Sequence, residues 1–515
     1  MNALNQQARE RLAERLDAYG LTADALAANW IDGRFVEGEG ELVTLMDPVT
    51  DAPLLSYRDA GAARVEAAAS AAERAQREWM ALTASERGRR LYRAATGLDG
   101  HEERLAGLES LIAGKPQRDC LGEVGKVREM FEYYAGWCDK QHGEVIDVPS
   151  SHLNYVQRVP YGVVGQITPW NAPLFTCGWQ LAPALAAGNG VVLKPSELTP
   201  ITSAILARLL ERAGELPPGL INIVNGLGPS TGAALTSHPA IAKLVFVGSP
   251  ETGRRIAEAG ASRLVPSVLE LGGKSANIVF ADAALDDAVA GAQAAIFAAA
   301  GQSCVAGSRL LLQESVAEAF LARLTQAVKA IRVGLPDDPA ARMGPLQNAA
   351  QYRRVQQLIE QALAEGATLL AGGERPAELP DEAQGYFLAP TILGDVTPEM
   401  RVASEEIFGP VLSVLTFRDE AEAVALANGT RFGLAGAVWS QDTGKALRVA
   451  HQLRAGTVWV NGYKSINVMS PFGGFGDSGY GRSSGPDGLR EYTTTRSVWV
   501  ETAPQASVAA GYGSS

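Results

Sequence analysis

The sequence predicts an α/β fold built from two parallel-sheet units. Short runs rich in Val, Ile and Leu alternate with segments of helical periodicity, which is typical of βαβ units. The runs of the first unit lie at 163–167, 191–194, 220–224 and 244–247, with a helical pattern at 201–213. After Glu270 the alternation resumes at 277–280, 309–313, 316–331 and 412–417, which predicts a second α/β unit.

The composition is that of a globular protein that handles small molecules. The chain has 515 residues, enough for two or three domains, and a formal net charge of −12. Binding of nucleic-acid phosphates needs clustered Lys and Arg, and the sequence has no basic run, so we expect no nucleic-acid partner. The most apolar stretch, 294–300, is too short to span a bilayer, which predicts a buried helix and no membrane partner.

The N-terminus and the cysteines indicate a cytoplasmic protein. The first 20 residues have charges at helical spacing and no continuous apolar core, which predicts a surface helix and no signal peptide. The four cysteines lack CxxC spacing and the five histidines are scattered, so we expect neither a metal site nor a disulfide framework.

Several glycine patterns fail as nucleotide or hydrolase motifs. Gly272-Gly273-Lys274-Ser275 resembles the end of a P-loop, but Val268 stands where the first glycine is required. The run 226–232 follows a predicted strand, yet its third glycine is one residue late for GxGxxG, and by itself it indicates only a turn. No GxSxG elbow supports a serine hydrolase.

Motifs in a fixed order carry the functional prediction. The first five are Thr168-Pro-Trp-Asn171, Lys194-Pro-Ser-Glu197, Phe246-Val-Gly-Ser249, Glu270-Leu-Gly-Gly-Lys274 and Gly301-Gln-Ser-Cys304. Three more follow, Glu405-Glu-Ile-Phe408, Phe432-Gly-Leu-Ala435 and Pro471-Phe-Gly-Gly474. Together they resemble the aldehyde dehydrogenase superfamily over residues 30–500, although each could arise alone by chance.

The candidate nucleophile is Cys304, which small residues flank. Cys120, Cys138 and Cys177 are interpreted as buried apolar residues, the usual role of a lone cysteine. The resemblance implies that the thiolate of Cys304 adds to an aldehyde carbonyl. It also implies that the Asn171 amide and the Cys304 backbone N–H stabilise the oxyanion.

The resemblance also implies a base for thioester hydrolysis. Loss of hydride from the thiohemiacetal leaves a thioester, and Glu270 is the family's candidate for activating water, with burial able to raise its pKa. Without the family context, Glu270 would be interpreted as an ordinary carboxylate at the end of a strand. Its presence favours hydrolysis over transfer to coenzyme A.

A cofactor site for NAD, with NADP possible, follows from the same resemblance. Lys194 and Glu197 are expected to bind the adenosine ribose, where a carboxylate would repel a 2′-phosphate. Gly248 and Ser249 precede a helix that begins near Glu251, a suitable place for the diphosphate, although Val247 and Pro250 replace the family's usual Thr. The other expected cofactor residues are Ile167, Thr168, Pro169, Trp170, Ser196, Gly228, Gly232, Phe246, Gly253, Leu271, Glu406 and Phe408.

The sequence indicates less about the substrate than about the reaction and the cofactor. The expected pocket residues are Lys126, Ala172, Thr176, Trp179, Ala298, Ser303, Val305, Ile466 and Phe472. Several are smaller than the aromatics common in the family, so we expect a medium-sized or bulky aldehyde, aromatic or branched. Lys126 leaves open an anionic semialdehyde, and a catalytically silent binding or structural member is a further alternative.

The resemblance also implies an architecture and an assembly. The cofactor domain is expected at 1–142 and 159–272, and the catalytic domain at 273–484. Oligomerisation strands are expected at 143–158 and 485–502, followed by a flexible tail at 503–515. A homodimer or homotetramer follows from the family.

Overall fold

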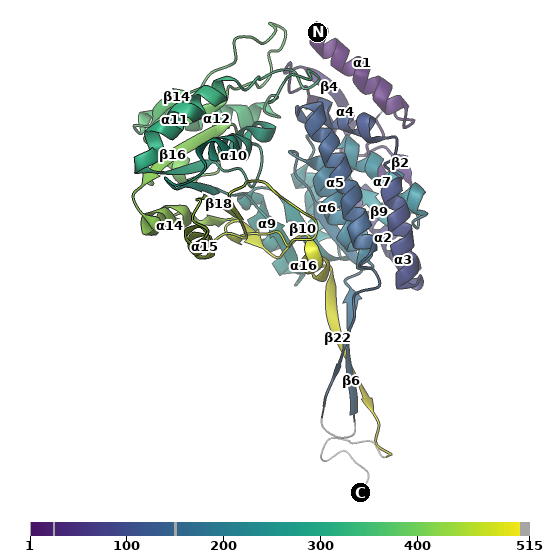
Figure 1. Cartoon of the computed structure of the whole chain (residues 1–515). Coiled ribbons are helices and arrows are strands. Elements are labelled where there is room, and N and C mark those ends of the chain that lie inside the picture. The colour runs from purple at the N-terminus through teal and green to yellow at the C-terminus, as the bar shows by residue number, and fades with distance from the viewer. Residues whose placement is uncertain (1, 24–25, 149–151, 505–515) are drawn as a thin grey trace.

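A computed structural model describes residues 2–23, 26–148 and 152–504, and Figure 1 shows two sheet-containing units side by side with a narrow stalk projecting below them. The predicted α/β class is confirmed. Residues 505–515 of the predicted tail lie outside the described part of the chain.

The first unit is an eight-stranded sheet whose central strands are parallel. The strand order is β2 (Arg34–Val36), β1 (Asn29–Ile31), β9 (Ile221–Ile223), β8 (Gly190–Lys194), β7 (Val163–Ile167), β10 (Ile241–Val247), β11 (Ser267–Glu270) and β21 (Gly479–Tyr480). Strands β7 and β8 are apolar and almost wholly buried, as expected of parallel strands covered by helices on both faces. The chain runs outward from β7 to β9 and then returns to β10, so the sheet changes direction between β7 and β10.

Helices cover this first sheet. They are α2 (Gly61–Ala81), α3 (Ala84–Thr96), α4 (Glu102–Ala113), α5 (Gln117–Ala135), α6 (Pro173–Ala186), α7 (Ile201–Gly214), the π-helical turn η1 (Gly228–Gly232), α8 (Ala233–Ser237) and α9 (Pro250–Ser262). The N-terminal helix α1 (Ala3–Asp17) packs on α4 and on strand β4 (Pro53–Arg58) through one face, where Leu12 and Leu16 are fully buried.

The second unit is a seven-stranded sheet. Its order is β14 (Thr368–Ala371), β15 (Thr391–Gly394), β16 (Val411–Phe417), β13 (Arg309–Gln313), β12 (Ala276–Val279), β18 (Ala435–Trp439) and β19 (Thr457–Val460). Its helices are α10 (Leu285–Phe297), α11 (Glu314–Lys329), α12 (Ala349–Ala364), α13 (Arg401–Ser404), α14 (Glu420–Asn428) and α15 (Thr443–Gln452). Only β14 runs antiparallel to its neighbour.

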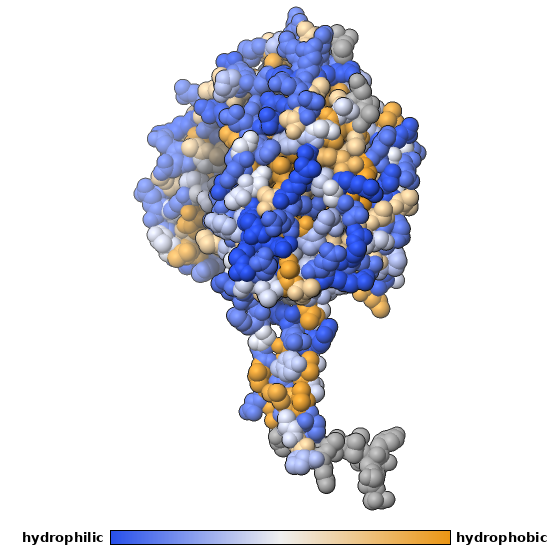
Figure 2. Space-filling model, turned by 90° about the vertical axis from the view of Figure 1, so that its right-hand side faces the viewer, coloured by the Kyte–Doolittle hydropathy of each residue, from blue (hydrophilic) through white to orange (hydrophobic). Residues whose placement is uncertain are grey.

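The stalk is a three-stranded antiparallel sheet. Its order is β22 (Thr493–Glu501), β6 (His152–Pro160) and β5 (Glu144–Ile146). Figure 2 shows apolar side chains gathered on this stalk. Two further two-stranded antiparallel sheets are formed by β3 (Leu42–Met46) with β4 (Pro53–Arg58), and by β17 (Phe432–Gly433) with β20 (Phe475–Gly476).

Three local expectations need correction. The stretch 294–300 is not one buried helix, because α10 ends at Phe297 and the following 3₁₀ turn η2 (Ala298–Gly301) contains left-handed residues. The segment after 485 begins as helix α16 (Gly485–Arg490) rather than as a strand. Strand β21, which falls within the expected catalytic domain, pairs with β11 of the first sheet. No helix among the described residues is long and apolar enough to cross a membrane.

Candidate functional site

A cavity of about 670 Å³ lies between the two units at the carboxyl ends of β7, β10 and β11. In open parallel sheets, ligands bind beyond the carboxyl ends of the strands where the sheet changes direction. Most of the predicted catalytic and pocket residues line this cavity, together with part of the predicted cofactor set. The predicted residues found there are Pro169, Trp170, Asn171, Ala172, Thr176, Trp179, Gly248, Ser249, Glu270, Leu271, Ser303, Cys304, Val305, Glu406, Phe408, Ile466 and Phe472.

Cys304 stands on a constrained loop after η2. Ala299 and Ala300 have φ values of 54° and 53°, in the left-handed region that non-glycine residues rarely adopt. Such strain persists only where surrounding contacts hold it, and it is common at functional sites. One such contact is made by Gln302, whose side-chain oxygen accepts a hydrogen bond of 2.9 Å from the backbone N–H of Gln347.

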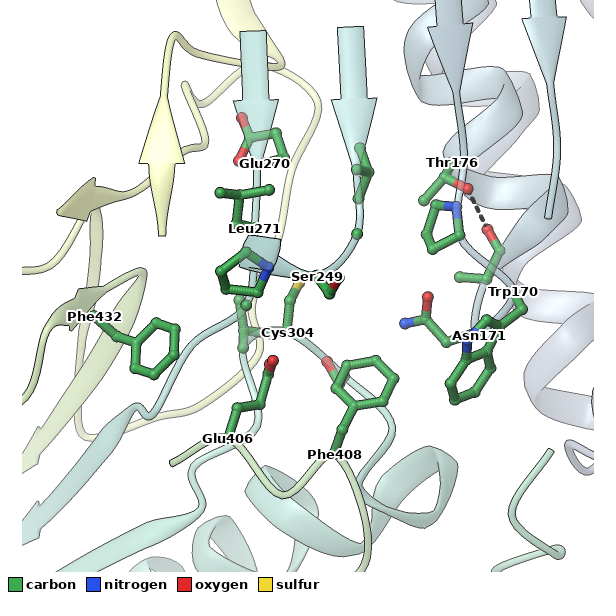
Figure 3. Close-up of a pocket in the computed structure, with 18 of the residues that line it drawn as sticks. Trp170, Asn171, Thr176, Ser249, Glu270, Leu271, Cys304, Glu406, Phe408 and Phe432 are labelled. Carbon is green, nitrogen blue, oxygen red and sulfur yellow. Dashed lines mark hydrogen bonds between the residues drawn. The ribbon is translucent and has the colours of Figure 1, made fainter. Parts of the chain in front are cut away.

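Asn171 lies beside this loop, just before α6. Its amide nitrogen donates one hydrogen bond of 2.9 Å to the backbone carbonyl of Gln302, two residues before Cys304. An amide NH₂ has two hydrogens, so the second can donate to a bound group. Figure 3 shows the Asn171 amide directed toward the region around Cys304.

Burial governs the charge state of the thiol and of the nearby carboxyls. Cys304 is half-buried at the cavity wall, and desolvation, together with Glu406 and Glu270, raises the pKa of its thiol to about 12. Desolvation also raises the pKa of Glu406 to about 7, although the Gly273 N–H donates to its carboxylate at 3.0 Å. Near neutral pH the Cys304 thiol is therefore uncharged and the Glu406 carboxyl is only partly ionised.

Glu270 ends β11 with its side chain buried. Desolvation raises the pKa of its carboxyl to about 8, and Ser483 and Arg482 lower that pKa only in part. Neither carboxyl oxygen makes a well-formed hydrogen bond within the described part of the chain. In Figure 3 the carboxyl points away from Cys304, so a rotation of the Glu270 side chain is needed to bring it toward the sulfur.

One end of the cavity suits an anionic dinucleotide. Ser249 caps α9 and accepts from the Thr252 N–H at 3.3 Å, so the first free N–H groups of the helix open on the cavity. A Cβ on Gly253 would lie 2.6 Å from Leu271, so this glycine permits close packing of α9 on the end of β11. The Thr168 hydroxyl is buried without a hydrogen-bond partner among the described residues, and a ligand group could satisfy it.

The remaining predicted cofactor residues lie at the adjoining edge of the sheet. Lys194 Nζ lies 3.5 Å from a carboxylate oxygen of Glu197, and desolvation lowers the pKa of Lys194. Gly232 approaches the Lys194 side chain, and a Cβ there would lie 3.6 Å from it. Ile167 and Phe246 pair across β7 and β10, Ser196 accepts from the Leu198 N–H, and Gly228 begins η1.

Comparisons with known proteins show the family to which the chain belongs. The model of the aldehyde dehydrogenase family matches residues 35–498. The chain belongs to this family. It is 43% identical to human (Homo sapiens) retinal dehydrogenase 2 over 90% of this chain and 89% of that protein, and 41% identical to betaine aldehyde dehydrogenase of Bacillus subtilis (strain 168) over 93% and 98%. The solved betaine aldehyde dehydrogenase of Staphylococcus aureus in complex with NAD+ superposes with a TM-score of 0.92 at 37% identity, covering 99% and 100% of the two chains.

Two predicted pocket residues do not line the cavity of this family member. Lys126 lies on α5, 47% exposed at its side chain, and pairs with Glu129 at 2.7 Å. Ala298 is exposed at the start of η2. Both residues were placed in the pocket by their spacing from the motifs along the sequence. Lys126 lies in the middle of α5 and Ala298 directly after the end of α10, and neither position lines the cavity.

Several residues of the cavity wall were not predicted from the sequence. Phe175 lines the cavity and packs against Trp179, with ring centroids 5.3 Å apart. Their i, i+4 spacing places both side chains on the same face of one helix, so the sequence could have indicated that Phe175 lies beside Trp179. Phe432 also lines the cavity. It begins one of the motifs quoted above, but the sequence did not indicate a role for it. Gln351, Arg354 and Arg431 come from distant segments, and only the fold brings them to the cavity.

Proposed function

We propose that the protein oxidises an aldehyde to a carboxylate with NAD+, through a thioester on Cys304. The observation that carries this proposal is the convergence of Cys304 and Asn171 on one cavity, next to a helix N-terminus that suits a diphosphate.

The attacking group is the Cys304 sulfur. Because burial raises the pKa of the thiol to about 12, attack must be coupled to loss of the thiol proton. Addition places negative charge on the former carbonyl oxygen, where the second hydrogen of the Asn171 amide and the Cys304 backbone N–H donate to it. These donors carry no negative charge of their own, which is what an oxyanion requires.

The dinucleotide is proposed to lie along Trp170, Ser249 and Glu406, with its ribose near Lys194 and Glu197. Its nicotinamide, when bound, supplies the acceptor for the hydride that the tetrahedral adduct loses. Trp170 and Phe408 meet edge to face with centroids 5.3 Å apart, which fixes an aromatic wall at this end. The Glu197 carboxylate supports a preference for NAD+ over NADP+, because it would repel a 2′-phosphate.

Glu270 is proposed as the base for hydrolysis of the thioester. Its carboxyl is buried and free of strong hydrogen bonds, so rotation toward the thioester breaks few interactions. In the ionised form it takes a proton from water, which attacks the acyl carbon and releases the Cys304 sulfur.

The pocket supports a medium-sized or bulky aldehyde. Ala172, Thr176 and Val305 leave room beside the aromatic wall of Phe175, Trp179 and Phe472. We further propose a homodimer or homotetramer assembled through the stalk. The four free cysteines suit a reducing compartment such as the cytoplasm.

The experiment measures NADH formation by absorbance from aldehydes of two carbons up to bulky aromatics, with NAD+ or NADP+. Wild type is compared with Cys304→Ala and with Cys138→Ala, a buried cysteine outside the cavity. We expect Cys304→Ala to abolish turnover and Cys138→Ala to retain it. Turnover that survives in Cys304→Ala would overturn the mechanism, and a clear preference for two-carbon aldehydes would overturn the size assignment.

A further inference from the structure

Helix α6 begins two residues after Asn171, and its own sequence provides no cap. The N-cap residue is Ala172, which has no side-chain oxygen, and Pro173 follows at the first helical position without an N–H. The first backbone donor of the helix is therefore the N–H of Leu174. Because no neighbour in the sequence accepts from this donor, the start of α6 needs an acceptor from elsewhere in the fold.

Glu109 on α4 supplies this acceptor. Its carboxyl group accepts from the Leu174 N–H at 3.1 Å and from the Thr202 hydroxyl, at the start of α7, at 2.6 Å. The Glu109 side chain is fully buried, and the Lys115 ammonium lies 3.9 Å from one of its oxygens. Desolvation raises the pKa of Glu109, and Lys115 together with the two hydrogen bonds opposes that rise. A buried carboxyl group with these partners holds α4, α6 and α7 together at one point.

The same end of α4 is also tied to the loop that carries Cys304. The Gln347 side-chain amide donates to the backbone carbonyl of Ile112, near the end of α4, at 3.2 Å. The backbone N–H of Gln347 donates to the side-chain oxygen of Gln302 at 2.9 Å, and the backbone carbonyl of Gln302 accepts from the Asn171 amide at 2.9 Å. One turn of α4 is therefore hydrogen-bonded, directly or through Gln347, to both segments that carry the oxyanion donors.

We propose that Glu109 is a positioning residue for the oxidation, which holds the Asn171 amide where the oxyanion forms. Asn171 lies only three residues before Leu174, with the rigid Pro173 between them, so a shift in the start of α6 moves the amide. Figure 3 places that amide across from Cys304. Glu109 does not line the cavity, so it acts through Asn171 and not on the substrate. This inference rests on the proposed function and adds a residue that positions its oxyanion donor.

The test compares three substitutions. Glu109→Ala removes the acceptor and leaves two buried donors, the Leu174 N–H and the Thr202 hydroxyl, without it. Glu109→Gln keeps an oxygen for the Leu174 N–H, and its NH₂ group can donate to the Thr202 oxygen, so it should restore the start of α6. The matched control is Glu123→Gln, which removes the carboxylate that binds Lys115 at 2.6 Å from α5. This control alters the environment of the same buried cation and leaves the bond from Glu109 to α6 in place.

Stopped-flow absorbance measures the rate of NADH formation in the first turnover, which follows acylation of Cys304. We expect Glu109→Ala to slow this step by about a hundredfold, the loss that a misplacement near 1 Å can cause. Glu109→Gln should restore most of the rate, and Glu123→Gln should match wild type. If Glu109→Ala does not fold, Glu109→Asp takes its place, since its shorter side chain withdraws the carboxylate from the Leu174 N–H. An equal loss in the Glu123→Gln control, or no loss in Glu109→Ala, would overturn the proposal.

A double-mutant cycle shows whether Glu109 acts through Asn171. In the Asn171→Ala background, Glu109→Ala should slow the first turnover no further, because no amide is left to position. A further hundredfold loss in the double variant would mean that Glu109 supports other parts of the site, and it would refute the positioning role.

Amide hydrogen exchange tests the cap without catalysis. Peptides that contain Leu174 should exchange faster in Glu109→Ala than in wild type, whereas Glu109→Gln and Glu123→Gln should keep the wild-type protection. If wild type oxidises no aldehyde, the proposed function fails, while exchange at Leu174 still decides whether Glu109 holds the start of α6. Unchanged exchange in Glu109→Ala would overturn the inference even where activity falls.

Discussion

At the scale of single residues, Cys304 and Glu270 are both kept uncharged by the same cavity. Burial raises the thiol pKa to about 12 and the Glu270 pKa to about 8, so both groups are protonated in much of the resting enzyme at pH 7. A protonated carboxyl cannot take a proton from water. The deacylation step therefore gains its base only as pH rises through about 8.

The first prediction concerns the pH profile of deacylation. If hydrolysis limits turnover, steady-state kcat should rise with pH, reach half of its maximum near pH 8 and level off above that. Glu270→Gln should remove this rise and lower kcat by about 10²- to 10⁴-fold, the usual contribution of a general base. Stopped-flow absorbance should still show a burst of one NADH per active site, because acylation does not need the base.

The control for this prediction is Glu129→Gln, which alters an exposed carboxylate on α5. It should leave both the burst and the pH profile as in wild type. A Glu270→Gln variant that loses its burst would place Glu270 in thiol activation instead of hydrolysis. An unchanged pH profile would show that another group limits turnover.

At the scale of elements, the strands that the sequence predicted lie close to observed strands, whereas the catalytic turn was not predicted. Strands β7 and β13 begin and end where the β-branched and Leu-rich runs do, because burial on both faces leaves an unbroken apolar signal. The run of three alanines before Gly301 has high helix propensity, yet the helix stops at Phe297. Contacts from Gln347 and Gly409, which are distant in sequence, override that propensity. The local sequence therefore could not indicate where the helix ends.

The second prediction concerns Gly301 in this turn. Gly301 has φ 71°, and a Cβ there would lie only 2.0 Å from the backbone oxygen of Gly409. Gly301→Ala should displace the Cys304 loop, reduce kcat/KM by about a hundredfold or more for a misplacement near 1 Å, and lower Tm. Aldehyde kinetics, thermal unfolding and the iodoacetamide alkylation rate of Cys304 measure these effects.

The matched control is Gly100→Ala. Gly100 has φ 78° but nothing within 4 Å of the position of a Cβ, so it carries the same backbone strain without the collision. It should lose about 1–2 kcal/mol of stability from the left-handed conformation and keep wild-type kcat/KM. Equal activity in the two variants would show that the turn at Gly301 adapts without moving Cys304.

At the scale of the whole molecule, distant parts of the chain complete the site. Strand β21 returns from the C-terminal region to pair with β11, so that Gly479 lies beside Glu270. The Ser484 hydroxyl and the Trp179 indole also form a hydrogen bond across this junction. Two-residue strands have too short a pattern to be recognised, which is why the expected boundary at 272 separated β11 from a strand, β21, that the fold places beside it.

The last prediction concerns assembly through the stalk, whose outer strands β5 and β22 each pair only with β6 in the sheet formed by the described residues. Val145 is 75% exposed and Trp499 is 60% exposed there, and apolar edges of this kind are usually covered by another chain. Light scattering after size exclusion should therefore give two or four times the 54.2 kDa chain mass. The double variant Val145→Asp/Trp499→Asp should give a smaller species, whereas Leu264→Asp, at a side chain 93% exposed on the body, should not change the mass. A wild-type monomer would refute assembly, and an unchanged mass in the double variant would move the interface away from the stalk.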